Sequence, residues 1–260
     1  MLRALRTAAL GMSAQQTSVD NTANNLANAN TTGFKKGRVA FQDLLYQRVR
    51  AAGGEDGAAP PAELQLGHGA VAVATVGTFT QGALTETGNA LDLAINGAGF
   101  FSVQLPDGGR AYTRDGAFTL TAEGLLVTQG GLALDPGVEV PADSVGVQVQ
   151  ADGTVLARLP GEPEPVELGQ VELARFTNPA GLRALGGNLF EQTDRSGAPV
   201  AAPPGEDGLG TVQQGFLEAS NVDVVQEMVD LIASQRAYEL NSKMVQASEE
   251  MLQIANGVKR

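Results

Sequence analysis

Residues 222–256 read VDVVQEMVDLIASQRAYELNSKMVQASEEMLQIAN, a stretch without proline or glycine. Apolar residues recur in it every three or four positions, interrupted at Arg236, and this period is typical of an amphipathic helix. Ser220, followed by Asp223 three residues later, resembles a capping box with a shorter acid. The stretch therefore predicts one long helix with a narrow apolar seam. The seam consists of Val225, Val229, Ile232, Leu240, Met244, Ala247, Met251, Ile254 and Val258.

The N-terminal end of the chain repeats this pattern. Its apolar residues follow a seven-residue repeat for more than three heptads, and Gln16 occupies the one polar position. We expect this helix to end near Asn28–Asn30, where asparagine, threonine and then Gly33 favour a stop. Its seam consists of Leu2, Leu5, Ala9, Met12, Val19, Ala23 and Leu26.

Between the two ends, the hydrophobic period changes from that of a helix to that of a strand. Apolar residues alternate with polar or small ones in several short runs, and Asn-Gly or Asp-Gly turn signals separate the runs. We predict an all-β body of short twisted strands. Residues 51–62 and 196–210 are predicted to be linkers, and Pro160–Pro165 a shorter break. The alternating runs lie at residues 91–95, 101–105, 118–120 and 125–127.

The charge and composition exclude several classes of function. The net charge is −12, from 17 basic and 29 acidic residues, so the chain would repel nucleic acid and anionic lipid. No apolar stretch approaches ~20 residues, so no direct membrane insertion is expected. A secretory h-region is missing too, and we expect any export to use another route.

Catalytic and metal sites have few candidate residues. The chain has no cysteine and one histidine, His68, which excludes disulfides, thiol catalysis and multi-histidine metal sites. We expect no cofactor and no metal. Lys35, Lys36 and Arg38 form a small basic cluster that we interpret as a solvated surface turn.

Each terminal seam needs a partner, because the rest of each helix is polar. The obvious partner is the helix at the other end of the same chain. Small residues on the remaining faces would let further helices approach closely, so a helical hairpin within one chain and a bundle of many subunits both remain open. These small residues are Ala8, Gly11, Ala27, Ala233 and Ala247.

Three separated motifs resemble those of the flagellar rod and hook axial proteins. The first is Asn24-Asn25-Leu26-Ala27-Asn28 with Thr32-Gly33-Phe34-Lys35. The second is Gly97-Ala98-Gly99-Phe100-Phe101 with Tyr112–Gly116, and the third runs from Ser220–Asp223 through Gln235–Glu239 to Asn241–Lys243. The residues that carry the resemblance are Asn24, Asn25, Asn28, Gly33, Phe34, Gly97, Gly99, Phe100, Arg236, Tyr238 and Asn241.

The resemblance implies an α+β fold, in which the N- and C-terminal helices pair as a coiled coil beside a central all-β body. It divides the chain into residues 1–30 and 211–260 as an inner helical domain, 31–75 as a connecting and rod-specific extended segment, and 76–210 as the β domain. Within the family, the length and residues 41–46 resemble the distal rod members, and residues 46–65 correspond to a segment thought to stiffen the rod.

The resemblance also implies a function in motility. The chain would be a structural subunit of the flagellar basal body, polymerising helically into a rigid hollow shaft that transmits torque and encloses the type III export channel. Its partners would be further copies of the same chain, the proximal rod proteins, the hook protein, the peptidoglycan-layer and outer-membrane rings, and the export apparatus.

Two alternatives remain. The chain could be a proximal rod or hook subunit of the same family. Much less favoured is a peptidoglycan-acting enzyme, for which Asp107 with Asp115 or Glu123 would have to supply paired carboxylates. Both aspartates precede glycine, and we interpret them as turn formers.

Overall fold

The computed structural model describes residues 2–50, 64–161 and 164–257, so that the whole of the predicted linker 51–62 lies outside the described residues. The chain forms two compact units. The helical unit contains Met1–Ala27, Gly37–Val76 and Asp223–Arg260, and the body contains Asn28–Lys36 and Gly77–Val222. The chain therefore passes between the units four times, after residues 27, 36, 76 and 222.

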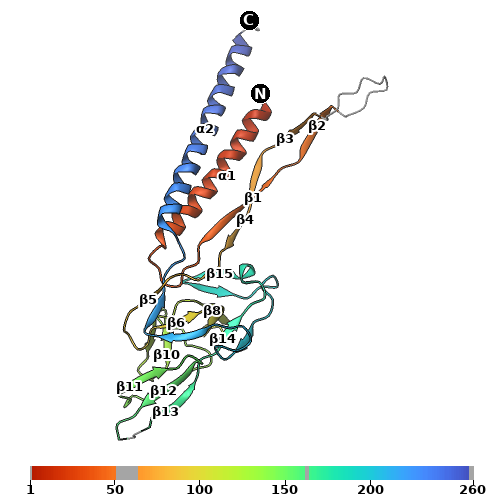
Figure 1. Cartoon of the computed structure of the whole chain (residues 1–260). Helices are drawn as coiled ribbons and strands as arrows, with labels where there is room; N and C mark the ends of the chain where they lie inside the picture. Colours follow the sequence, from red (N-terminus) through yellow and green to blue (C-terminus); the bar gives the residue numbers. More distant parts are fainter. Residues whose placement is uncertain (1, 51–63, 162–163, 258–260) are drawn as a thin grey trace. The chain divides into compact units, whose positions relative to one another are not determined.

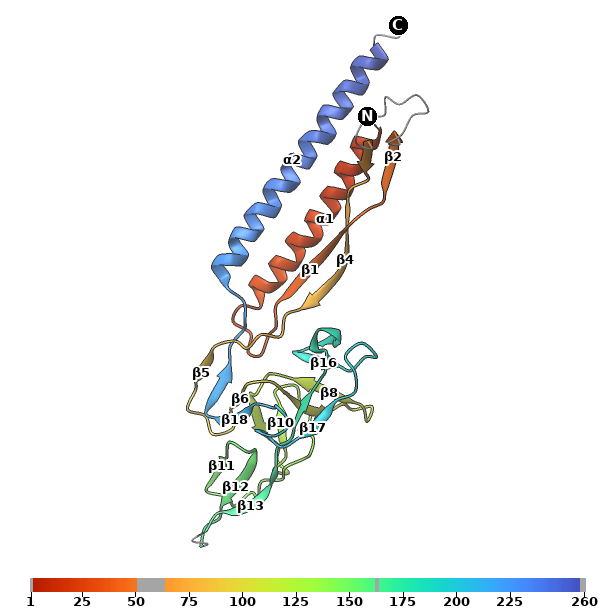
Figure 2. The same cartoon turned by 45° about the vertical axis from the view of Figure 1, so that its right-hand side comes forward.

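The helical unit is built on two antiparallel helices, α1 (Leu2–Ala27) and α2 (Val224–Gly257), which lie side by side (Figures 1 and 2). The C-terminal end of α2 extends past the N-terminus of α1 (Figure 1). Two hydrogen-bonded ribbons, β1–β4 and β2–β3, complete the unit, and β1 contacts α1. Their strands are β1 (Gly37–Asp43), β2 (Tyr46–Arg50), β3 (Leu64–Gly67) and β4 (Ala70–Gly77).

The ends of both helices agree only in part with the sequence prediction. Helix α1 ends at Ala27, which confirms the predicted stop. The predicted capping box at the start of α2 is wrong, because Asp223 is itself the N-cap. Its Oδ1 accepts hydrogen bonds from the backbone N–H groups of Val225 (3.0 Å) and Gln226 (3.2 Å), while Ser220 Oγ accepts from Val222 N–H, before the helix.

The body is all-β apart from one short 3₁₀ turn, η1 (Pro179–Gly181), among its described residues. Its largest sheet is antiparallel, in the order β15-β16-β8-β7-β14-β17. A three-stranded sheet β11-β12-β13 and the pairs β9–β10, β6–β18 and β5–β19 make up the rest. Strands β6, β7, β9 and β10 confirm the four alternating runs. The strands are β5 (Leu84–Glu86), β6 (Leu93–Asn96), β7 (Phe100–Gln104), β8 (Arg110–Thr113), β9 (Phe118–Leu120), β10 (Leu126–Thr128), β11 (Gly146–Val149), β12 (Thr154–Arg158), β13 (Val166–Gln170), β14 (Leu173–Arg175), β15 (Arg183–Gly186), β16 (Leu189–Glu191), β17 (Val200–Ala202), β18 (Thr211–Gln214) and β19 (Phe216–Glu218).

The predicted linker at residues 196–210 is wrong in its middle. Strand β17 lies there and pairs antiparallel with β14, with Ala202 opposite Leu173. Ala202 is buried in the core. The strand is short and alanine-rich between prolines, so the sequence carries almost no period that would have revealed it.

The core lies on both faces of the large sheet, because neighbouring residues of a strand point to opposite faces. On β7, Phe101 packs edge-to-face on Phe118 in the larger core cluster. Phe100 points the other way and packs edge-to-face on Phe79 and Phe176 in a smaller aromatic cluster. This pair of clusters explains how a chain without tryptophan stabilises a body of short strands.

The side chain of Gln214 ties the three-stranded sheet to the rest of the body. Its Oε1 accepts from Val149 N–H (3.1 Å), and its Nε2 donates to the carbonyls of Val147 (2.9 Å) and Ala90 (2.7 Å). The amide therefore satisfies backbone groups along the edge of β11 as a neighbouring strand would.

Candidate assembly interface

Helix α2 exposes an apolar stripe that is interrupted at Arg236. Its members recur every three to eight residues along the helix, and at least half of the surface of each side chain is exposed. Ala247 is also exposed on this helix. We call these residues the α2 stripe: Val225, Val229, Ile232, Leu240, Met244, Met251 and Ile254. They include all the described large apolar residues of the predicted C-terminal seam.

The more buried side of α2 is different, because polar residues alternate there with the half-buried Leu231, Val245 and Leu252. Glu227, Ser234 and Ser248 are buried there. Asn25 Nδ2 of α1 donates a 3.0 Å hydrogen bond to Glu227 Oε2, and the hydroxyls of Ser18 and Ser234 lie 3.2 Å apart. Polar side chains thus form part of the contact between the two helices. Of the stripe, Met244 lines a hollow together with Ala8 of α1.

The predicted seam of α1 is intermediate in exposure between the α2 stripe and the buried side of α2. Its large members are half-buried, namely Leu5, Met12, Val19 and Leu26. Its small members Ala9 and Ala23 are exposed, and the side chain of Leu2 lies outside the described residues.

Two residues of α1 that the sequence suggested for contact with further subunits lie elsewhere. Ala8 is buried within the helical unit. A Cβ on Gly11 would lie 3.0 Å from Nδ2 of Asn241, so Gly11 faces the α2 helix of its own chain. That suggestion is wrong for both residues, since the polar side of α2 needs small residues opposite it.

The first family motif holds the start of β1 against α1. Asn25 Oδ1 accepts from Gly37 N–H (2.9 Å) while its Nδ2 donates to the Gly37 carbonyl (2.9 Å), and Asn21 Nδ2 donates to the same carbonyl (2.8 Å). Asn25 is almost completely buried. The asparagine therefore links α1, β1 and, through Glu227, α2. Asn24 is exposed, and Asn28 caps the turn after α1 by accepting from Thr31.

The glycines of the first two motifs allow close approach of the backbone. Gly33 has φ +67°, and a Cβ there would meet the backbone nitrogen of Asp115 at 2.5 Å. Gly97 and Gly99 also have positive φ, and a Cβ on either would meet Gly210 or Leu209. Phe34 is half-buried, and Phe100 is buried in the aromatic cluster.

The C-terminal motif is largely on the surface of α2. Arg236 is exposed and forms a 2.9 Å ion pair with Glu239, and Tyr238 is partly exposed. Asn241 lies opposite Gly11, as described above. An exposed pair of this kind contributes little to stability.

The body buries a cluster of three charges. The carboxylate of Glu218 pairs with Lys35 Nζ and with Arg114 Nη1 (3.2 Å), and all three side chains are almost inaccessible. Lys35 also donates to the carbonyl of Thr80 (2.8 Å), and Arg114 Nη2 donates to that of Gly97 (2.8 Å). The cluster joins the segment after α1, the end of β8 and the end of β19.

Burial dominates the electrostatics of this cluster. Desolvation lowers the pKa of Lys35 below its ordinary value of 10.5, against the opposing effect of Glu218. Desolvation likewise lowers the pKa of Arg114. The interpretation of Lys35 as part of a solvated surface turn is wrong, because its ammonium group has a carboxylate partner 183 residues away in the chain.

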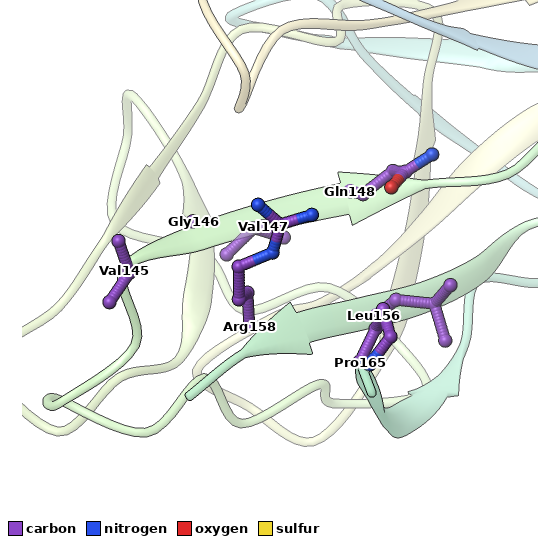
Figure 3. Close-up of a pocket in the computed structure, with 7 residues that line it drawn as sticks. All are labelled: Val145, Gly146, Val147, Gln148, Leu156, Arg158 and Pro165. Atoms are coloured by element: carbon purple, nitrogen blue, oxygen red, sulfur yellow. The ribbon is translucent and has the colours of Figure 1, made fainter. Parts of the chain in front are cut away.

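Two hollows of the surface show the chemistry available. One of about 220 Å³ lies on β11 and β12 and is lined by Arg158 together with apolar side chains that include Val147, Leu156 and Pro165 (Figure 3). The other, about 260 Å³, lies in the helical unit and includes Arg3, His68 and Asn241. Neither of these two hollows contains a carboxylate. A third, about 170 Å³, lies in the body and includes Tyr112, Asp135 and Glu172.

The carboxylates considered for catalysis form turns. Asp107 Oδ1 accepts from Gly109 N–H (3.0 Å), and Asp115 Oδ1 accepts from Thr32 Oγ1 (2.9 Å) and Ala117 N–H (3.2 Å). Glu123 is exposed. Across residues 2–50, 64–161 and 164–257, no group of three or more histidines and carboxylates is placed to hold a metal ion. In the same ranges neither helix is sufficiently apolar for a membrane span.

Comparison with known proteins places these features in one family. Residues 5–35 match the model "Flagella basal body rod protein", 94–157 match "Flagellar hook protein FlgE/F/G D1 domain", and 213–258 match "Flagellar basal body rod FlgEFG protein C-terminal". The flagellar basal-body rod protein FlgG of Borreliella burgdorferi is 47% identical, with 100% of both chains covered. FlgG of Caulobacter vibrioides is 46% identical, with 97% of each chain covered.

The chain belongs to the flagellar basal-body rod protein family. It is a structural rod subunit of the flagellar basal body, which is the function that the three motifs implied. The rod protein FlgF of Caulobacter vibrioides is 39% identical over 93% of each chain. The similarity to FlgG is greater and covers more of the chain, and the proximal rod or hook alternative is not favoured. The family is structural rather than enzymatic.

Sequence reasoning missed two features of this rod protein. Nothing near Glu218 marks it as the centre of a buried charge cluster, because its partners come from distant segments. The polar side of α2 could have been found, since Glu227, Ser234, Asn241 and Ser248 recur every seven residues. A search for apolar periodicity alone passes over them.

Proposed function

We propose that this rod protein polymerises helically into the distal rod through the α2 stripe, forming a rigid hollow shaft that transmits torque from motor to hook and encloses the export channel. The observation that carries the proposal is the stripe itself, a row of large apolar residues that are each at least half exposed. Surfaces of this kind mark protein contacts.

The partner that fits the stripe is a second copy of the same chain. Full burial of a Val, Leu, Ile or Met side chain is worth about 1.5–3 kcal/mol relative to exposure. Seven such residues on every subunit supply contacts that repeat along a polymer. A head-to-tail contact that does not close on itself yields an open helical filament, which suits a shaft.

The finer organisation is part of the same proposal. Residues 1–30 and the helix within 211–260 would form an inner layer of coiled-coil pairs, 31–75 a rod-specific segment, and 76–210 the outer body. The other partners would be the proximal rod proteins, the hook protein, the peptidoglycan-layer and outer-membrane rings, and the type III export apparatus.

The test compares polymerisation of the purified full-length chain with that of a stripe variant. Ile232→Ser combined with Leu240→Ser removes two exposed apolar groups on α2, and Gln235→Ser, also exposed, is the matched control. Substitutions at exposed positions usually change the free energy of unfolding by about 0.5 kcal/mol or less. We expect the subunits of all three proteins to have the same thermal stability. Electron microscopy should show filaments of the native chain and of the control, but not of the stripe variant.

The same variants can be expressed in cells that lack the protein. The stripe variant should fail to restore the rod and swimming, and the control should restore both. Normal filaments and normal swimming with the stripe variant would show that the chain polymerises through a surface other than the α2 stripe.

A further inference from the structure

The contacts between α1 and α2 follow one register throughout. Asn25 meets Glu227, Ser18 meets Ser234, and Gly11 meets Asn241. From each pair to the next, the position moves seven residues back along α1 and seven forward along α2. We call these three pairs the polar layers.

The residues of the polar layers do not give the helix pair the greatest possible stability. A Glu, a Ser and an Asn occupy the inner positions of α2, although the same helix carries a full set of large apolar residues on its stripe. A buried polar pair adds little net stability compared with well-packed apolar residues. A single buried polar residue in a helix seam does, however, specify register and partner, because a shifted pairing leaves it without a hydrogen-bond partner.

The first layer is fixed by its surroundings. Both polar atoms of the Asn25 amide are engaged with the Gly37 backbone, at 2.9 Å each, so the side chain cannot turn freely. The same Nδ2 donates to Glu227 Oε2 at 3.0 Å. A slip of α2 by one heptad would place Ser234 opposite Asn25, out of reach of this bond, and would leave the Glu227 carboxylate buried without it.

We infer that the polar layers are a specificity device, which assigns each α1 to the α2 of its own chain in a single register and keeps the α2 stripe free for other copies. The inference rests on the proposed self-assembly, in which many identical helices lie close together. The layers disfavour pairing of α1 with a stripe, because Asn25 and Ser18 would then face Val229 or Ile232 and lose their hydrogen bonds to Glu227 and Ser234. They equally disfavour an apolar hairpin that would consume the stripe within one subunit.

The chain contains no cysteine, so introduced cysteine pairs report the pairing directly. Ser18→Cys with Ser234→Cys samples the native register, and Ser18→Cys with Asn241→Cys samples a slip of one heptad, about 10 Å along the helix. That displacement exceeds what a disulfide spans. Oxidation of dilute full-length monomer, followed by electrophoresis without reductant, separates cross-links within a chain from those between chains.

With the Asn25–Glu227 layer intact, we expect cross-links within one chain for the first pair and almost none for the second. In a Glu227→Leu background, slipped and between-chain cross-links should rise about tenfold, which corresponds to one lost hydrogen-bonded layer of ~1.4 kcal/mol. Glu227→Gln retains an acceptor for Asn25 Nδ2 and should restore the native pattern. An unchanged ratio of native to slipped cross-links in Glu227→Leu would overturn the inference.

A second background covers the case in which Glu227→Leu does not fold, as judged by circular dichroism. Ser18→Leu removes the middle layer, and Gly11→Cys with Asn241→Cys or with Ser248→Cys then samples the native register and the same slip of one heptad. The same tenfold change is expected, and its absence again overturns the inference. These measurements use monomers, so a failure of the register is distinct from a failure of stripe-dependent polymerisation.

Discussion

Lys35 and Glu218 lie 183 residues apart in the chain, yet their charged groups meet in the interior of the body beside Arg114. The first residue follows α1 and the second ends β19, shortly before α2 begins. The segments that connect the body to both helices are therefore held by one carboxylate.

Removal of this carboxylate should be costly. Glu218→Gln leaves two buried cations without a counter-charge, and we expect the free energy of unfolding to fall by about 3–5 kcal/mol. Glu191→Gln is the matched control, because its pair with Arg183 is exposed and worth at most ~1 kcal/mol. Urea unfolding measures both. Equal losses in the two variants would contradict a special role for the buried cluster.

The pH dependence of stability should reveal Lys35. Its pKa in the folded protein lies below 10.5, so between that lowered pKa and 10.5 the unfolded chain binds more protons than the folded one. The free energy of unfolding therefore gains a contribution that rises with pH across this window, and below it the cost of the buried charge is fully present. Lys35→Met should lack this rise.

The quantity to compare is the difference in free energy of unfolding between the native chain and Lys35→Met at each pH. Tyr112 acts in the opposite direction, since burial raises its pKa above 10.0 and stability falls as the pH passes that value. This effect is common to both proteins and cancels in the difference. A difference that stays flat up to pH 10 would show that Lys35 is not desolvated.

Gly33 and Gly88 form a matched pair for testing the first family motif. Both have a positive φ, but a Cβ on Gly33 would meet the Asp115 backbone at 2.5 Å, and a Cβ on Gly88 would meet nothing within 4 Å. Gly88→Ala should cost roughly 1 kcal/mol from backbone strain alone. Gly33→Ala should cost clearly more, because the connecting segment must also move. Thermal melts of the two variants decide, and similar melting temperatures would refute the crowding argument.

Asp223 should account for the start of α2. Asp223→Ala removes an N-cap that accepts two backbone hydrogen bonds, and a loss of about 0.5–2 kcal/mol is expected. Ser220→Ala should change little, since Ser220 precedes the helix. Helix content by circular dichroism and hydrogen exchange at Val225 and Gln226 provide the readout. Faster exchange in the serine variant instead would restore the capping-box interpretation.

The sequence predicted both helices well because their signals are local. The spacing of Val225, Val229 and Ile232, and the absence of proline and glycine, suffice to define α2. The alternation at Leu93 and Phe101 likewise marks strands within a few residues. Local periodicity is the strongest signal that a single sequence carries.

The parts that could not be predicted depend on distant partners. Lys35 looks like any surface lysine until Glu218 is placed beside it, and β17 has no period of its own until β14 pairs with it. Pairing across the chain determines these environments, and local composition does not reveal it.

The four passages of the chain between the helical unit and the body have a consequence for proteolysis. Each passage is a covalent connection, and the four are separate along the chain. A protease that cuts one of them therefore leaves the two units joined by the other three.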